Sequence, residues 1–409
     1  MIERIDGREA WGVTVASMII ASLAFGAPYV VIVALKPIAA DFGGYRSVPS
    51  AAASLAILGT GVGGLLMSWL AERVGVRSVV AIGGLMVCAG LVLSSRASDG
   101  EAWALYLGHG LLVGLVGNAA IQAPLYVYVT RWFDRRRGTA LALIASGQYI
   151  AGACWPPLFQ RAIDEYGWRQ TMVGFGVLVG AIVAVLALVF LRPAPEVTTT
   201  TARAPSGGEC GKVLGLPRNT AFALLAIAAF LCCVPMAMPS SHLIALCGDL
   251  GVAPAKSAAM LTVLLVCAFV SRQFWGWISD RVGGLTTVCV GSLAQAMAIT
   301  GFIATQDETG LLAASAAFGF GFSGLIPAYV LTSRQLFPAR EASWRIPTLI
   351  LTGMSGMAVG SWLAGVLYDF FGFYAPAFAM GLAFNLANLV IVASLLVLWR
   401  QSHARLVLH

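Results

Sequence analysis

Charged residues are scarce in this chain: only 11% of its 409 residues are Asp, Glu, Lys or Arg, while 59% are hydrophobic. Soluble domains carry roughly a quarter of charged residues, so a chain of this composition cannot hide its apolar residues in one aqueous core. Hydrophobic runs of about 20 residues recur along almost the whole chain, and each can cross a hydrocarbon layer of about 30 Å as a helix. We therefore predict an all-α membrane protein with about twelve transmembrane helices.

Signals for other classes of protein are also sparse. The first hydrophobic run, residues 11–35, is too long for a signal peptide and has no small-residue cleavage site behind it, so we interpret it as a membrane span. Most of the eight cysteines lie inside apolar runs without the spacing of a zinc site or a disulfide framework. The four histidines form no set with a nucleophile or a base, and the basic residues form no aromatic-basic face. These absences argue against an enzyme, a resident metal or other cofactor, and a nucleic-acid partner.

The loops between the hydrophobic runs predict the topology. The predicted spans cover residues 11–35, 48–71, 78–95, 103–130, 138–163, 170–191, 220–246, 257–279, 285–305, 309–332, 344–368 and 374–399. If the N-terminus is cytoplasmic, 18 of the 25 Lys and Arg residues fall on the inner side, as the positive-inside rule requires. We therefore expect a multi-pass protein of a bacterial inner membrane with both termini cytoplasmic. Residues 192–218, rich in Thr, Pro and Gly, are predicted to be a flexible cytoplasmic linker between six-helix bundles of residues 1–191 and 219–409.

A short motif occurs once in each predicted half. Residues 68–75 read SWLAERVG at the end of the second span, and residues 276–283 read GWISDRVG at the end of the eighth. The matched positions indicate an internal duplication, and the residues that repeat are Glu72, Arg73, Gly75, Asp280, Arg281 and Gly283. An acid, an arginine and a glycine just inside the cytoplasm resemble the loop signature of the major facilitator superfamily. The resemblance implies a substrate site between two halves near the midplane and alternating access by rocking of one half against the other.

One charged residue lies well inside a predicted span: Arg272, about two helical turns before Asp280. A charge at that depth costs roughly 2.5–3.5 kcal/mol on insertion scales, and the sequence places no Asp or Glu at a similar depth. A guanidinium can form two parallel hydrogen bonds with a carboxylate, so our hypothesis is that Arg272 binds the carboxylate of a substrate. The alternative is an arginine that reaches the cytoplasmic interface or bonds to backbone carbonyls.

Uncharged polar residues at mid-span depth could complete such a site. Asn118, Gln122 and Tyr126 recur every four residues and therefore share one helix face. Tyr29 and Gln148, on the first and fifth spans, add further hydrogen-bonding groups. Each of these side chains could instead hold neighbouring helices together.

A second resemblance comes from the loop after the fourth span. Residues 132–147 read WFDRRRGTALALIASG, which includes Arg135, Arg136 and Arg137, and this segment is similar to the second signature of the monocarboxylate transporter family. Bacterial members of that family include oxalate:formate antiporters. In the family an arginine on the eighth span binds the substrate carboxylate and a tyrosine on the tenth span lies near it. Arg272 and Tyr329 occupy the matching places, so the resemblance implies a substrate-binding role for both.

Two departures from the family pattern bear on the substrate and its coupling. Proton-coupled animal members carry a lysine on the first span and an aspartate on the eighth, where this chain has Tyr29 and Ala268, so their coupling scheme does not transfer directly. The second cation of the oxalate exchanger, on the eleventh span, has no counterpart at residues 352–355. A single arginine favours a monocarboxylate over a dicarboxylate.

The sequence therefore predicts a secondary transporter of a small organic anion, favouring a lactate-like or pyruvate-like acid. It would act as a monomer in the lipid bilayer, either by proton symport or by exchange for a counter-anion. Two alternatives remain at this point. The first is an exporter of drugs or other hydrophobic compounds, and the second is an oxalate-type dicarboxylate exchanger.

Overall fold

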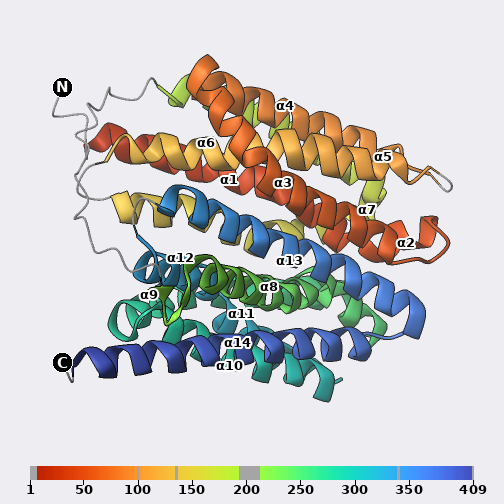
Figure 1. Ribbon diagram of the computed structural model, residues 1–409. Helices are drawn as coiled ribbons and strands as arrows, with labels where there is room; N and C mark the ends of the chain where they lie inside the picture. The colour runs from red at the N-terminus through yellow and green to blue at the C-terminus, as the bar shows by residue number, and fades with distance from the viewer. Residues whose placement is uncertain (1–6, 99–100, 134–136, 193–211, 339–340, 408–409) are drawn as a thin grey trace. The chain divides into compact units, whose positions relative to one another are not determined.

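A computed structural model describes residues 7–98, 101–133, 137–192, 212–338 and 341–407 (Figure 1). Nearly all of these residues are helical, because a helix satisfies its own backbone hydrogen bonds where lipid offers none. Eleven helices of the described chain are long and apolar enough to cross a membrane. One of them, α7, joins two helices at Gly167, where φ is 79° and ψ is 163°, and counting both gives the twelve that the sequence predicts. The all-α membrane fold is confirmed.

The elements lie close to the predicted spans. In chain order they are α1 (Arg8–Val33), α2 (Leu35–Asp41), α3 (Ser47–Val74), α4 (Val76–Ser95), α5 (Trp103–Tyr106), the π-helix η2 (Leu107–Asn118), α6 (Ala119–Thr130), α7 (Arg137–Phe190), β1 (Lys212–Val213), β2 (Leu216–Pro217), α8 (Arg218–Asp249), α9 (Pro254–Val282), α10 (Gly284–Ala304), α11 (Glu308–Phe322), α12 (Leu325–Leu336), α13 (Ala342–Phe371) and α14 (Ala375–Val407).

The chain divides into two compact units. Unit 1 holds residues 1–199 together with residues 242–265, and unit 2 holds residues 200–241 and 266–409. The end of α8 and the start of α9 therefore pack with the N-terminal helices, whereas the rest of both helices packs with the C-terminal ones.

Close contacts between small residues hold unit 1 together. Helix α7 packs against α1 and α4, and η2 packs against α3 and α4. A Cβ added to Gly63 on α3 would lie 2.1 Å from the backbone oxygen of Leu115 on η2, so only glycine allows the two backbones to approach this closely.

Unit 2 is built in the same way from different helices. Helix α10 packs against α11, α12 and α14, and α13 lies against α12 and α14. A Cβ on Gly360 of α13 would lie 2.0 Å from the backbone oxygen of Val234 on α8.

Three local features depart from uniform α-helical spans. The fourth span contains the π-helix η2, and the tenth is broken into α11 and α12 at Ser323 and Gly324. At the end of the predicted linker, β1 and β2 form a two-stranded antiparallel hairpin. Its turn residues, Leu214 and Gly215, have φ of 57° and 77°, the pattern of a type I′ turn.

Candidate functional site

The repeated motif has the same local geometry in both units. Gly75, with φ of 88°, separates α3 from α4, and Gly283, with φ of 83°, separates α9 from α10. Two residues before each glycine, an arginine covers a tryptophan: the guanidinium carbon of Arg73 lies 3.9 Å from the ring centre of Trp69, and that of Arg281 lies 3.8 Å from the ring centre of Trp277. Because positive φ favours glycine, the two equivalent turns explain why both copies of the motif end in this residue.

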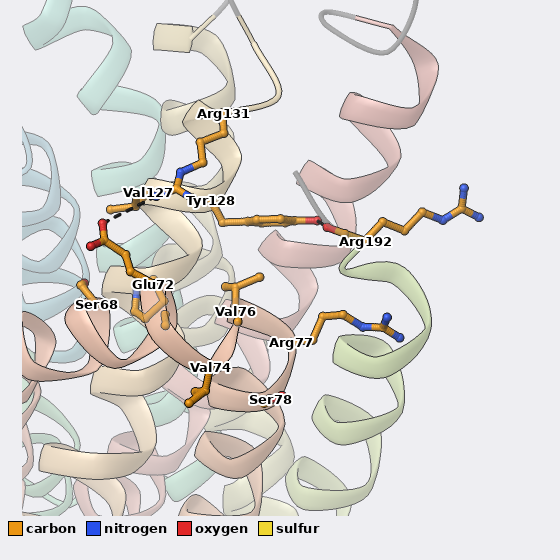
Figure 2. A pocket seen from close by; sticks show the side chains of 13 residues that line it. Ser68, Glu72, Val74, Val76, Arg77, Ser78, Val127, Tyr128, Arg131 and Arg192 are labelled. Atoms are coloured by element: carbon orange, nitrogen blue, oxygen red, sulfur yellow. Dashed lines mark hydrogen bonds and ion pairs between the residues drawn. The ribbon is translucent and has the colours of Figure 1, made fainter. Parts of the chain in front are cut away.

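A surface cavity of about 310 Å³ lies beside the first copy of the motif (Figure 2). Residues from the end of α3, the start of α4 and the end of α6 line it, together with Arg192 just after α7. Its charged lining residues are Glu72, Arg77, Arg131 and Arg192. Among the described residues that line this cavity, cationic groups thus outnumber acidic ones by three to one.

Hydrogen bonds and ion pairs around the cavity join the ends of several helices. Arg131 lies 3.6 Å from Glu72, measured between the Arg nitrogen and the Glu oxygen, and the hydroxyl of Tyr128 donates a 2.5 Å hydrogen bond to the backbone oxygen of Arg192. Arg77 donates to the backbone oxygen of Leu188 near the end of α7. Figure 2 shows the side chains of Arg77 and Arg192 pointing to the same side, away from the pair that Arg131 forms with Glu72.

Arg272, the predicted carboxylate ligand, lies in the second half of α9 within unit 2 and is partly buried. Its immediate neighbour Ser271 is buried, and its hydroxyl lies 2.7 Å from that of Ser323 at the break between α11 and α12. One turn later, Trp275 donates a 2.6 Å hydrogen bond to the backbone oxygen of Phe320. The backbone groups freed by a broken membrane helix need such partners, so both interactions tie the Arg272 region of α9 to the break.

Tyr329, the other predicted ligand in unit 2, lies on α12 and is buried. Its hydroxyl donates a 2.5 Å hydrogen bond to the side-chain oxygen of Asn388 on α14. The amide group of Asn388 in turn donates to the hydroxyl of Ser292 on α10 at 2.9 Å. In this structure Tyr329 therefore belongs to a buried polar network that joins three helices of unit 2.

The remaining predicted ligands all lie in unit 1. Asn118 ends η2 and is buried, and the side-chain oxygen of Asn118 has no hydrogen-bond partner among the described residues. Gln122 and Tyr126 follow on α6 and are partly buried. Tyr29 on α1 lies against Gly152 on α7, one turn beyond Gln148. Arg135 and Arg136 lie outside the described residues, as does the side chain of Arg137.

Two charged clusters have no counterpart in the sequence interpretation. At the start of α3, Arg46 binds both carboxylate oxygens of Asp249 at 2.5 and 2.6 Å, and Lys36 lies 3.0 Å from the same carboxylate. In unit 2, the buried Arg345 pairs with Glu341 at 2.7 Å. Nothing in the sequence signals the first pair, because its partners are 203 residues apart.

The second cluster surrounds the Arg345 guanidinium with aromatic rings. The rings of Phe222, Phe337 and Trp344 have their centres 4.7, 4.3 and 4.3 Å from its carbon atom. Cation–π attraction of this kind partly offsets the desolvation of a buried cation. The adjacent Trp344 is the only part of this cage that local sequence could have suggested.

Twelve membrane-length helices and a duplicated acid–Arg–Gly turn define a secondary transporter fold. The family model of the Major Facilitator Superfamily matches residues 15–244 and again residues 225–407, so the chain belongs to this superfamily of transporters. It is therefore a multi-pass membrane transporter and not an enzyme.

Comparison with individual proteins narrows the relationship. The chain is 29% identical over 385 residues to monocarboxylate transporter 13 of Rattus norvegicus, covering 94% of this chain and 88% of that protein. It is 28% identical to monocarboxylate transporter 4 of Gallus gallus, over 89% of this chain and 78% of that one. The similarity to monocarboxylate transporters that the second signature indicates thus extends over most of the chain.

Solved structures confirm the fold at lower sequence identity. The nucleoside transporter NupG superimposes with a TM-score of 0.71 at 11% identity, covering 94% of this chain and 99% of that one. The peptide transporter POT in complex with alafosfalin gives a TM-score of 0.71 at 13% identity, covering 93% of this chain and 94% of that one. Because these proteins differ in their named substrates, the shared fold carries no information on the substrate of this chain.

Proposed function

We propose that this transporter moves a small monocarboxylate, lactate-like or pyruvate-like, and that Arg272 binds its carboxylate. The observation that carries the proposal is the position of Arg272: a partly buried guanidinium in the second half of a membrane-length helix, eight residues before Asp280 of the duplicated motif. Placing a cation there costs free energy, and binding an anion recovers part of that cost. The distant similarity to monocarboxylate transporters supports the same substrate class.

The surroundings of Arg272 support a role in orienting a substrate. Ser271 and Trp275, which flank it on α9, are both bonded to the broken segment between α11 and α12. These bonds fix the stretch of α9 that carries Arg272, and a fixed backbone lowers the cost of ordering a site when a ligand binds. The guanidinium of Arg272 can offer a carboxylate two parallel hydrogen bonds.

In this proposal the transporter lies in a bacterial inner membrane with both termini cytoplasmic. It works by alternating access, either as a proton symporter or as an anion exchanger. Neither Tyr29 nor Ala268 reproduces the charged residues of proton-coupled relatives, so their coupling scheme does not transfer to this chain. One cationic ligand is compatible with both coupling modes.

Transport in proteoliposomes tests the proposal. Labelled lactate, pyruvate, formate and oxalate are offered with and without a pH gradient to wild type, Arg272→Ala and Arg272→Lys. We expect monocarboxylate uptake that Arg272→Ala abolishes. Arg272→Lys should keep some uptake with a raised KM, because Lys retains the charge but not the paired hydrogen bonds. Arg334→Ala is the matched control, since Arg334 lies in the last turn of α12 in the same unit and is exposed.

The pattern of uptake separates the competing explanations. Uptake that rises with an inward proton gradient indicates symport, and uptake that requires an internal anion indicates exchange. Equal monocarboxylate uptake by wild type and Arg272→Ala would refute the role of Arg272. Uptake of oxalate alone, or efflux of hydrophobic drugs without carboxylate transport, would refute the monocarboxylate assignment.

A further inference from the structure

The cavity beside the first copy of the motif contains a strongly cationic set of side chains outside the proposed substrate site. Of the residues that the structure describes, Arg77, Arg131 and Arg192 line it with Glu72 as the single lining carboxylate. All four side chains belong to unit 1. A cavity with this excess of positive charge favours an anionic ligand.

Each of these arginines already makes a contact within the protein, and Arg77 donates a hydrogen bond to the backbone oxygen of Leu188. Arg131 and Glu72 are both about half exposed at an N–O distance of 3.6 Å, and Arg192 lies 3.5 Å from Glu9. Exposed pairs of this kind contribute about 1 kcal/mol or less. A guanidinium carries five N–H donors, so one such contact leaves donors for a further ligand.

Exposed apolar side chains surround the cationic cavity. Val74 and Val127, which also line it, are exposed, as are Leu188, Val189 and Phe190 at the adjoining end of α7. Exposed apolar side chains at the ends of membrane-spanning helices are a suitable surface for acyl chains. Figure 2 shows Arg77 and Arg192 pointing to the side of the cavity where α7 ends. The cavity thus joins an exposed apolar surface to a cluster of guanidinium groups.

From this juxtaposition we propose that the cavity binds the phosphate of an anionic phospholipid, with Arg77 and Arg192 as its principal ligands. Arginine recognises phosphate by paired, charge-assisted hydrogen bonds, and basic pockets between membrane helices are suited to acidic head groups. The acyl chains lie along Leu188 and Phe190. A volume of about 310 Å³ accommodates a glycerophosphate head group but not a whole lipid, in agreement with chains that remain outside.

Lipid retention by the full-length protein tests this proposal. Wild-type protein is purified from mixed phosphatidylglycerol and phosphatidylcholine, and bound lipids are counted by native mass spectrometry. We expect one phosphatidylglycerol to be retained in preference to phosphatidylcholine. Each arginine near a membrane surface contributes about 1 kcal/mol to such binding, so Arg77→Gln and Arg192→Gln should each weaken it about five-fold.

Controls separate lipid binding from loss of structure and from general attraction of anions. Arg96→Gln removes an exposed arginine from the opposite end of α4 and should leave retention unchanged. Arg77→Lys keeps the charge but not the paired hydrogen bonds, so it should retain more of the binding than Arg77→Gln. Loss of binding through misfolding would not follow the charge of the side chain in this way. Equal retention of both lipids by the wild type, an equal loss in Arg96→Gln, or complete displacement by inorganic phosphate in place of lipid would overturn the proposal.

Discussion

Replacing Asp249 by Asn should destabilise unit 1, because it removes the negative charge between two cations. Arg46 is almost buried, with its side chain 7% exposed, and it contacts both oxygens of Asp249, whose side chain is 24% exposed. Removing one partner of a fully buried pair costs about 3–5 kcal/mol. Water reaches Asp249, so we expect a smaller loss of about 2–3 kcal/mol. The repulsion between Arg46 and Lys36, which Asp249 now separates, adds to this loss.

A second ion pair of the same unit is a matched control. Arg169 and Asp41 are also 2.5 Å apart, but their side chains are 44% and 37% exposed. Asp41→Asn should therefore cost no more than about 1 kcal/mol. The two variants make the same chemical change at the same shortest ion-pair distance. The difference between them therefore reports the burial of Arg46 together with the second cation, Lys36, at Asp249.

Thermal unfolding of the purified protein, followed by tryptophan fluorescence at low and high salt, measures both effects. The Tm of Asp249→Asn should lie several degrees further below the wild-type Tm than that of Asp41→Asn. High salt should change the Tm loss of Asp249→Asn less than the Tm loss of Asp41→Asn. Replacing both partners, in Arg46→Met with Asp249→Leu, should recover part of the stability. Equal shifts in the two single variants would refute the reasoning that burial of Arg46 sets the magnitude.

Three further substitutions test the packing of each unit by thermal unfolding. Gly63→Ala should cost about 1–3 kcal/mol through overpacking, whereas Gly174→Ala, where an added Cβ meets no atom within 4 Å, should be close to neutral; similar Tm values would contradict the close approach of α3 and η2. Tyr329→Phe should cost about 1–3 kcal/mol by leaving Asn388 without its donor, and an accompanying rise in substrate KM would support its predicted ligand role. Arg345→Ala should cost at least about 3 kcal/mol, because Glu341 and three aromatic rings lose their partner; an unchanged Tm would show that the cage is unimportant.

Individual residues show how far the sequence could predict the site. Arg272 was recognisable because a charge inside an apolar run is costly whatever surrounds it. The hydrogen bond between Tyr329 and Asn388 was not, because both residues lie in apolar spans 59 positions apart. The contact between Gly63 and the backbone of η2 was not recognisable either, since any helix with small residues would permit a similar approach.

The sequence alone determined that the chain is a membrane protein of twelve helices with a duplicated turn. Hydrophobic length and local motifs are properties of consecutive residues, and the bilayer allows a long apolar segment little choice but a helix. Only the tertiary structure decided which polar groups meet: Arg46 with Asp249, Ser271 with Ser323, and the arginines around one cavity. These contacts depend on the rotation and register of packed helices. Many arrangements bury nearly the same apolar area, so hydrophobicity cannot select among them, and the fit of individual side chains does.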